Sequence, residues 1–201
     1  MIIIQLAGGL GNQLQQYALY QKFKSIGVEA KLDLSWFEQF EDTCRESKNK
    51  EQNKDDHGTN KIKPAIKQDI VVTNRQCELD FFEHLPYESC TKEEKTALTG
   101  SQGLAGKLRR KLLPQTVHWY KEEQMYDPEL LNYRKMYLSG YFACEKYYAD
   151  ILPELREMIR FPEIVDARKR MANEEILKKI RNSHAVSVHI RRGDYLQPEN
   201  A

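Results

Sequence analysis

The first 34 residues alternate between short apolar runs and polar stretches, and this pattern predicts three elements. Residues 2–6, IIIQL, form a β-branched run typical of a buried strand, and the glycine-rich stretch AGGLGNQ follows at once. Apolar side chains then recur every three or four residues, at Leu14, Ala18, Leu19, Phe23 and Ile26. The opposite side is polar, with Gln15, Gln16, Gln21, Lys22 and Lys24. This spacing predicts an amphipathic helix with Asn12 as its N-cap and Gly27 just beyond its end.

A second strand is predicted at residues 28–34, VEAKLDL, where apolar and polar side chains alternate. The order strand, glycine turn, helix, strand is typical of the beginning of a parallel sheet. We therefore expect an α/β fold whose first part resembles a Rossmann unit.

The middle of the chain carries weaker signals. Residues 41–63 contain hardly any apolar side chains and mix both charges, so we expect a long polar surface loop. Residues 78–87 are typical of a short helix. The basic amphipathic stretch at 103–114, GLAGKLRRKLLP, fits either a solvated helix face or a contact with a membrane surface or lipid-linked acceptor.

Regular patterns return from residue 135 onwards. Residues 135–142 predict a strand, and residues 144–161 predict helix on both sides of Pro153, which suits the first turn of the second piece. Residues 162–183 give the clearest helix, with Pro162 near its start and two i,i+4 pairs, Glu174 with Lys178 and Glu175 with Lys179. Residues 185–190, AVSVHI, predict one more strand.

Composition restricts the classes of partner and compartment. With 201 residues the chain can hold one full domain, or one domain and the start of another. A net charge of +1 gives no general attraction to nucleic acid, so any anion site must be local. We expect a cytoplasmic protein without signal peptide or membrane span. Cys44, Cys77, Cys90 and Cys144 lack metal or redox spacing and are interpreted as reduced structural thiols.

The glycine turn is the first candidate binding element. Gly8, Gly9 and Gly11 allow close backbone approach, the helix start offers free N–H groups, and the side-chain amides of Asn12 and Gln13 suit a hydroxyl-rich sugar. The dinucleotide pattern GxGxxG is half met, because Leu14 replaces its third glycine, while Asp33 stands where a ribose-binding acid would. A nicotinamide-dependent oxidoreductase and a tight turn without ligand both remain alternatives.

The second candidate element is the cluster HIRRGD. His189 and Arg191 share one face of the predicted strand, and Arg192 follows at its carboxyl end, where open α/β sheets bind ligands. Two guanidinium groups can hold a diphosphate bidentately, His189 can hydrogen-bond a phosphate or sugar, and Asp194 can orient an arginine, bind ribose or accept a proton. The alternative is an exposed strand end with an Arg to Asp ion pair.

Four stretches together carry a resemblance to a known family: GGLGNQLQQYA, LDLSWF, LSGYFACEKYY and HIRRGDYL. The chain resembles the bacterial α-1,2-fucosyltransferases, glycosyltransferase family eleven, whose HxRRxD pattern is met by His189, Arg191, Arg192 and Asp194. The resemblance implies a GT-B-type enzyme of two Rossmann-like halves. Such an enzyme transfers L-fucose from GDP-fucose to the 2-hydroxyl of a galactose-terminated glycan in surface polysaccharide synthesis such as O-antigen, with inversion and without a metal or other cofactor.

The resemblance also assigns roles to residues. Arg191 and Arg192 would stabilise the leaving diphosphate. Asp194 is one candidate for the general base, and the alternative is a base in the part of the second half that would follow residue 201. His189, Gly8, Gly9, Gly11, Asn12 and Gln13 would bind substrate, with Asn12 close to the donor sugar or β-phosphate. No DxD metal motif occurs, in keeping with a metal-independent enzyme.

Two departures from the family pattern affect these expectations. Gln15 occupies a usually apolar helix position and would weaken the turn if buried without a partner. In the resembled enzymes HxRRxD opens the second half, so residues 1–182 would be an acceptor-side domain and residues 183–201 an incomplete donor-binding domain. On this basis the chain is expected to be truncated, and an inactive remnant that binds sugar or GDP is the alternative to an enzyme.

Overall fold

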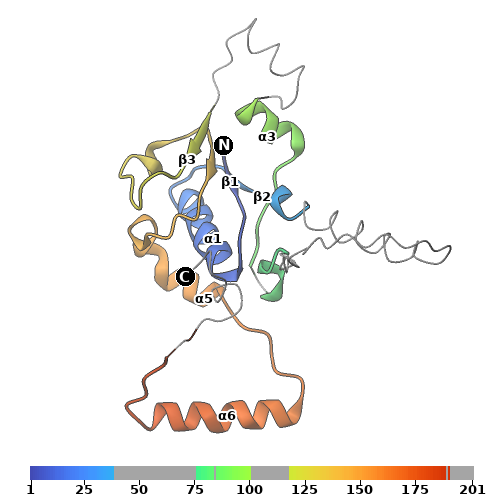
Figure 1. Ribbon diagram of the computed structural model, residues 1–201, viewed down its shortest axis with the longest axis vertical. Coiled ribbons are helices and arrows are strands. Elements are labelled where there is room, and N and C mark those ends of the chain that lie inside the picture. The colour runs from blue at the N-terminus through green and yellow to red at the C-terminus, as the bar shows by residue number, and fades with distance from the viewer. Residues whose placement is uncertain (39–75, 84, 101–117, 189, 191–201) are drawn as a thin grey trace, which may run out of the picture. The chain divides into compact units, whose positions relative to one another are not determined.

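The computed structural model describes residues 1–38, 76–83, 85–100, 118–188 and 190, and its chain divides into two compact units, Met1–Phe161 and Pro162–Ala201. The first unit is built on a parallel sheet of four strands in the order β2-β1-β4-β3 (Figure 1). The strands are β1 Ile2–Gln5, β2 Ala30–Asp33, β3 Trp119–Lys121 and β4 Met136–Ser139. The expected α/β class with a parallel sheet is confirmed. The GT-B architecture and the domain boundary at residue 182 stay predictions.

The central strand β1 is buried on both faces, which explains its unbroken isoleucine run. Ile2 and Ile4 belong to the large core cluster that includes Tyr17 and Phe23 of helix α1, Leu10–Ser25. Ile3 packs on the other face with Tyr137 and with Leu98 of helix α3, Lys92–Thr99. The sheet therefore lies between two helices, one on each face.

Helix α1 ends as predicted. Gly27 has φ +75°, its N–H donates to Lys24, and the N–H of Val28 donates to Phe23, which together form a Schellman motif. Its buried surface, however, is wider than the apolar spacing indicated. Gln16 and Lys22, expected on the polar side, are buried, and Lys22 forms an ion pair with Asp150 at 2.5 Å.

Helix α3 was not predicted, although the sequence carries a signal for it. Thr91 and Glu94 form a capping box, in which each side chain accepts a hydrogen bond from the other residue's backbone N–H. Strand β3 was also missed, because three residues are too few for a periodicity to show.

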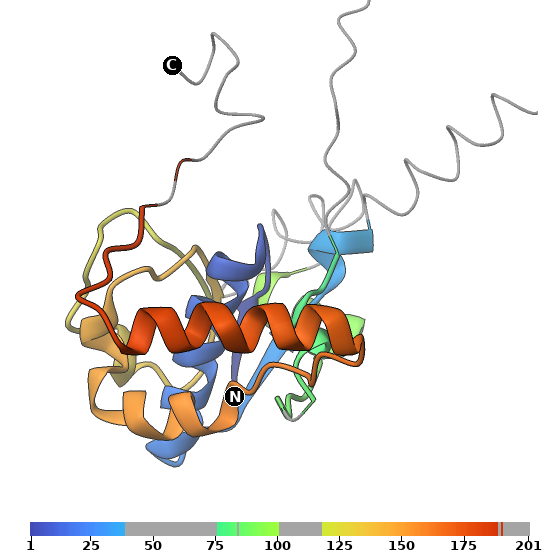
Figure 2. The ribbon, with the colours of Figure 1, turned by 90° about the horizontal axis from the view of Figure 1, so that it is seen from below.

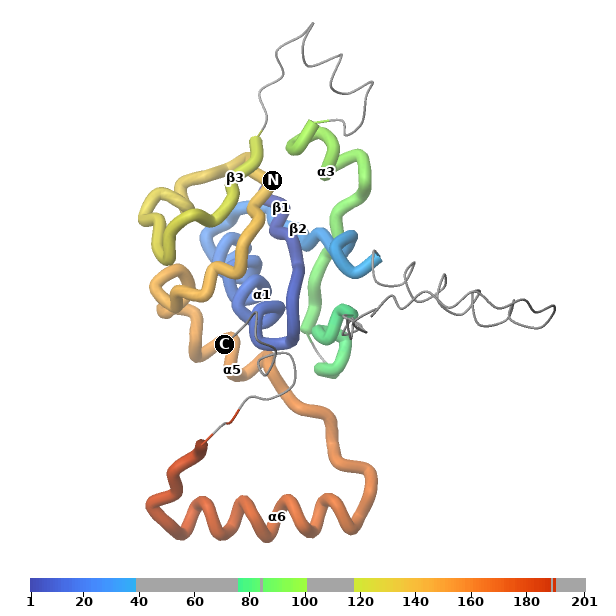
Figure 3. Tube along the Cα trace, in the orientation of Figure 1, coloured from blue at the N-terminus to red at the C-terminus, as the bar shows by residue number. Residues whose placement is uncertain are grey.

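The remaining elements of the first unit are short. The predicted helix at 78–87 is the 3-10 turn η1, Leu79–Phe81, and the connection from β3 to β4 contains η2, Leu130–Asn132 (Figure 3). After β4 come η3 Glu145–Tyr147, η4 Ala149–Ile151 and helix α5 Leu152–Met158. Pro153 lies in the first turn of α5, as predicted.

In the described part of the second unit, residues 167–181 form a continuous helix, α6, Ala167–Arg181 (Figure 2). Asp166 caps it, since its carboxylate accepts hydrogen bonds from the N–H groups of Arg168 and Lys169. The helix therefore begins at Ala167, five residues after Pro162, which was predicted to lie near its start. The predicted pair of Glu175 with Lys179 is present at 3.0 Å.

The strand predicted at 185–190 is wrong for its described part. Residues 185–188 have irregular backbone, and Val186, Val188 and Ile190 are 86%, 78% and 78% exposed. Alternating apolar side chains make a strand only where a neighbouring strand pairs with them, and no described residue does so here.

Several other expectations concern residues that the structure does not describe, including the polar loop at 41–63, the basic stretch at 103–114 and Cys44. Cys77, Cys90 and Cys144 are free thiols. Among the described helices, none combines the length and apolar character needed to cross a membrane.

Candidate functional site

The carboxyl ends of β1 and β4 lie side by side at the point where the strand order reverses. From β1 the chain continues to β2 on one side, while β4 pairs with β1 on the other, with Ile2 opposite Met136. In open parallel sheets, the crevice outside such a point is the usual place for a ligand. Two turns meet there: the glycine turn after β1 and the turn at residues 140–142 after β4.

The glycine turn leads directly into the start of α1. Gly9 is the N-cap, in extended conformation, and no side chain caps the helix or places a carboxylate in its first turn. The predicted N-cap, Asn12, is wrong, because the helix already begins at Leu10. The first-turn N–H groups have no carbonyl within the helix to receive them, and the helix dipole makes this end positive. These features favour an anionic or hydroxyl-rich ligand.

Only one of the three glycines is required by the backbone conformation. Gly8 has φ +82°, and a Cβ there would lie 2.6 Å from Nδ2 of Asn12. Gly11 is exposed, and a Cβ there would meet nothing within 4 Å. Nothing in the described part of the chain therefore requires a glycine at position 11. A glycine here is consistent with a ligand that approaches the backbone closely.

We expect Gly8→Ala to lower the stability of the protein and Gly11→Ala not to lower it. Alanine at position 8 must adopt a left-handed conformation and displace Asn12, so it should cost about 1–2 kcal/mol. In a domain of this size that lowers Tm by about 3–8 °C in a thermal melt. Alanine at position 11 should leave Tm unchanged or raise it slightly, because alanine favours the helix. A stable Gly8→Ala variant would contradict the described turn.

Gln13 is fully buried and its amide is used within the protein. Its Nε2 donates to the carbonyls of Gly8 and Gln76, both at 3.0 Å, and its Oε1 accepts the N–H of Glu78 at 2.7 Å. Gln13 therefore holds the glycine turn against the segment that precedes η1. A direct contact with substrate stays a prediction, which full burial does not favour.

Gln16 plays a corresponding role that the sequence analysis missed. Its Oε1 accepts the N–H of Ala7 at 2.9 Å and its Nε2 donates to the carbonyl of Gly140 at 2.8 Å. The two turns of the crevice are thus joined through one buried amide. A signal was present, because Gln13, Gln16, Tyr17 and Tyr20 follow the helical i, i+3, i+4, i+7 spacing.

Gln15 was expected to weaken the turn if its amide is buried without a partner, and its side-chain oxygen is buried in this way. Among the described residues, its Oε1 is a buried polar atom with no hydrogen-bond partner. Leaving such an oxygen unpaired costs about 1–3 kcal/mol, which weakens the helix just behind the turn.

The turn after β4 is held by Glu122, a residue that no sequence pattern singled out. Its carboxylate accepts the N–H groups of Tyr141 at 2.7 Å and Phe142 at 3.1 Å. Phe142 has φ +51°, an unfavourable conformation for phenylalanine that these bonds stabilise. The pair of N–H groups resembles an anion-binding nest whose anion is supplied by the protein itself.

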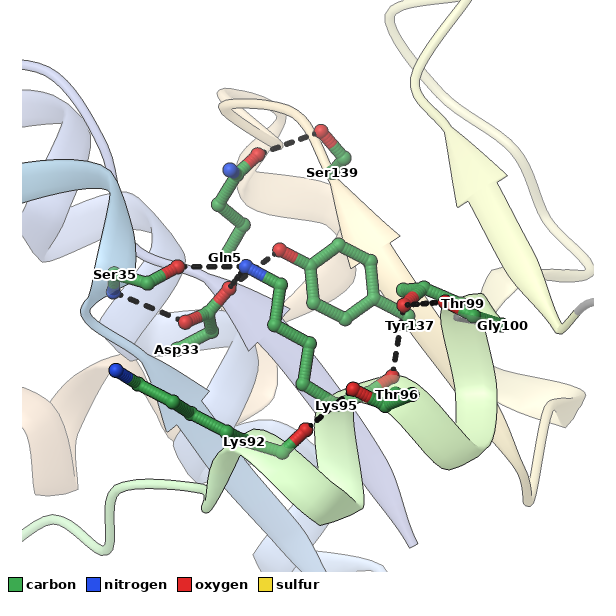
Figure 4. A network of polar contacts seen from close by, with 10 residues as sticks. All are labelled: Gln5, Asp33, Ser35, Lys92, Lys95, Thr96, Thr99, Gly100, Tyr137 and Ser139. Atoms are coloured by element: carbon green, nitrogen blue, oxygen red, sulfur yellow. Dashed lines mark hydrogen bonds and ion pairs between the residues drawn. The ribbon is translucent and has the colours of Figure 1, made fainter. Parts of the chain in front are cut away.

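A buried polar network links the carboxyl end of β2 to β4 and to α3 (Figure 4). Asp33, 3% exposed, accepts the Tyr137 hydroxyl at 2.6 Å and lies 2.8 Å from Nζ of Lys95. The N–H of Ser35 donates to the same carboxylate at 3.0 Å. Burial alone would raise the pKa of Asp33, but the hydrogen bonds from Lys95, Tyr137 and Ser35 outweigh it and lower the pKa. Burial, followed by the bond to Asp33, raises the pKa of Tyr137.

This network bears on the nicotinamide alternative, which needed Asp33 to bind a ribose. Both carboxylate oxygens of Asp33 accept hydrogen bonds from protein groups, and the residue is almost inaccessible. The geometry therefore favours a structural role for this acid.

His189, Arg191, Arg192 and Asp194 lie outside the described residues, so their predicted roles stay predictions. Within the described ranges, no group of three or more His, Cys, Asp or Glu side chains is arranged to hold a metal ion.

A comparison with known families gives a match for the part of the chain from just before β3 to residue 201. Residues 118–201 match glycosyl transferase family 11. The match includes β3, β4, α5, α6 and the HIRRGD motif, and supports a glycosyltransferase of the fucosyltransferase type. The glycine turn lies before the matched range. No curated protein and no solved structure shows significant similarity to the chain.

Proposed function

We propose that this protein is an α-1,2-fucosyltransferase, which transfers L-fucose from GDP-fucose to the 2-hydroxyl of a terminal galactose with inversion. The match of residues 118–201 to glycosyl transferase family 11 carries the proposal. The described fold is compatible with it, because a parallel sheet with a glycine turn at its ligand-binding edge is a common frame for a nucleotide-sugar site.

The reaction requires charge stabilisation on the leaving group. The 2-hydroxyl oxygen of galactose attacks C1 of fucose, the bond from C1 to the β-phosphate oxygen breaks, and its electron pair leaves with GDP. The proton of the hydroxyl passes to a general base, for which Asp194 is the candidate. Arg191 and Arg192 would hold the diphosphate with fixed positive charge, which is the largest contribution that a protein makes to such a step.

The glycine turn would form the facing wall of the site. The first-turn N–H groups of α1 and the backbone at Gly9 and Gly11 would approach the donor, and the Asn12 amide would hydrogen-bond its sugar or β-phosphate. Gln13 and Gln16 would act as positioning residues, because their amides fix this turn to its neighbours.

The proposal predicts GDP release that depends on both GDP-fucose and a galactoside. We expect purified protein to release GDP when lactose is added, and the product to carry fucose on the 2-hydroxyl of galactose by NMR. Activity should persist in EDTA, because two arginines replace the metal that would otherwise neutralise the diphosphate. Absence of lactose-dependent GDP release would reject the proposed activity, and loss of activity in EDTA would reject metal independence.

A further inference from the structure

An open groove of about 570 Å³ lies on the segment that contains η1 and is separate from the glycine turn. It is lined by Leu79, Asp80, Phe82, Glu83, Leu85 and Pro86. Its volume falls in the range typical of small-molecule sites. The two polar side chains are carboxylates, both on exposed residues, and none of the described lining residues is basic. The groove can therefore accept hydrogen bonds from hydroxyl groups, while its charge repels a phosphate.

Two phenylalanine side chains beside the groove are exposed to solvent and are not part of the buried core. Phe81 is 55% exposed and Phe161 is 72% exposed, whereas Phe82, which lines the groove, is buried. The ring of Phe82 lies 5.5 Å from that of Phe81 and 5.4 Å from that of Phe161. The three rings form an aromatic cluster, Phe81, Phe82 and Phe161, against which an apolar face of a ligand can pack.

Hydrogen bonds of Gln13 join the segment that forms the groove to the glycine turn. Gln13 binds the carbonyl of Gln76 and the N–H of Glu78, and the first lining residue, Leu79, comes next in the chain. The same amide holds the carbonyl of Gly8. The position of the groove is thus fixed to the glycine turn by one buried side chain.

We propose that this groove and the aromatic cluster bind the neutral glycan acceptor, and this inference rests on the proposed transferase function. One face of a galactose ring presents C–H groups that pack on aromatic rings, while its hydroxyls donate to Asp80 and Glu83. The anionic donor is excluded, because two carboxylates would face its phosphates. The anionic donor therefore binds at the glycine turn, and the neutral acceptor binds in the groove.

The test combines a lactose titration with steady-state kinetics of the full chain. We expect Phe81→Ala and Phe161→Ala each to raise the lactose Kd and KM about tenfold, the effect of losing one aromatic contact of this kind. Glu83→Gln should have a smaller effect in the same direction. The affinity for GDP and the Tm should stay unchanged, because all three side chains are exposed. Met125→Ala removes an apolar side chain that is 80% exposed and serves as the control.

Unchanged lactose affinity in both phenylalanine variants overturns the inference, even where transfer proceeds normally. The same holds if the wild-type protein does not bind lactose, or if the variants lose GDP affinity in parallel. Failure of the proposed function gives a different result, in which the wild type binds lactose, the variants bind it more weakly, and no fucose is transferred.

Discussion

Simultaneous replacement of Arg191 and Arg192 by alanine is expected to lower kcat for fucose transfer by about 10³-fold or more, since removing one preorganised donor to a developing charge costs about 10²–10³. The cost falls on kcat, because negative charge on GDP grows as the bond to fucose breaks. The lactose KM should change little, since in the proposed site the arginines bind the donor and not the acceptor. GDP release under saturating GDP-fucose measures the effect.

Two further variants identify the origin of this loss. Arg192→Lys keeps the positive charge but cannot hold a phosphate bidentately, so its activity should lie between wild type and the double variant. Arg170→Ala removes an equally basic, exposed residue of α6 and should leave kcat unchanged. A double variant whose kcat stays within tenfold of wild type would show that these arginines do not stabilise the leaving group.

Lys95→Met should lower the free energy of unfolding by about 3 kcal/mol, the largest stability effect that we expect in the described part of the chain. The substitution leaves Asp33, whose side chain is 4% exposed, buried without its counter-ion. It also removes the bond from Nζ to the Ser35 hydroxyl, at 2.6 Å. Urea denaturation followed by circular dichroism measures the change.

The loss should be partly reversed by removing the other charge. Lys95→Met combined with Asp33→Leu no longer buries an unpaired carboxylate, so it should be more stable than Lys95→Met alone. Lys92→Met replaces an exposed lysine of the same helix and should change stability little. A Lys95→Met variant as stable as the Lys92→Met variant would contradict the buried ion pair.

Acid should weaken the wild-type protein through the same network. The pKa of Asp33 is lowered in the folded state, so its contribution is fully present above the unfolded pKa of about 3.9 and is lost as the pH falls through the lower folded value. The stability advantage of wild type over Lys95→Met should therefore be largest near neutral pH and shrink below pH of about 4. An advantage that is constant from pH 7 to pH 3 would exclude a charge effect.

Local patterns predicted the elements that depend mainly on neighbouring residues. Short apolar or alternating runs predicted strands β1, β2 and β4. Pro153 indicated the first turn of α5, and Gly27 indicated the end of α1. Helix α3 could have been found from Thr91 and Glu94, because a capping box is itself a local signal.

Predictions failed where burial depends on distant partners. Gln16 and Lys22 belong to the polar side by composition, yet Gly140 and Asp150 supply the partners that allow them to be buried. Residues 185–190 have the alternation of a strand, but a strand also requires a neighbour to pair with. In each case the missing information is a long-range contact.

The sequence by itself determined that the chain begins as a parallel α/β unit with a glycine turn, because strand periodicity and glycine act through local chemistry. That HIRRGD binds an anion stays a prediction from the chemistry of its two arginines. Only the tertiary structure decided that β4 adjoins β1, so that Ser139 contacts Gln5 across 134 residues of chain. It also decided that Gln13 and Gln16 brace the turn, and that Lys95 neutralises Asp33. A polar group is buried only when its partners are in place, and those partners are brought together by folding of the whole unit.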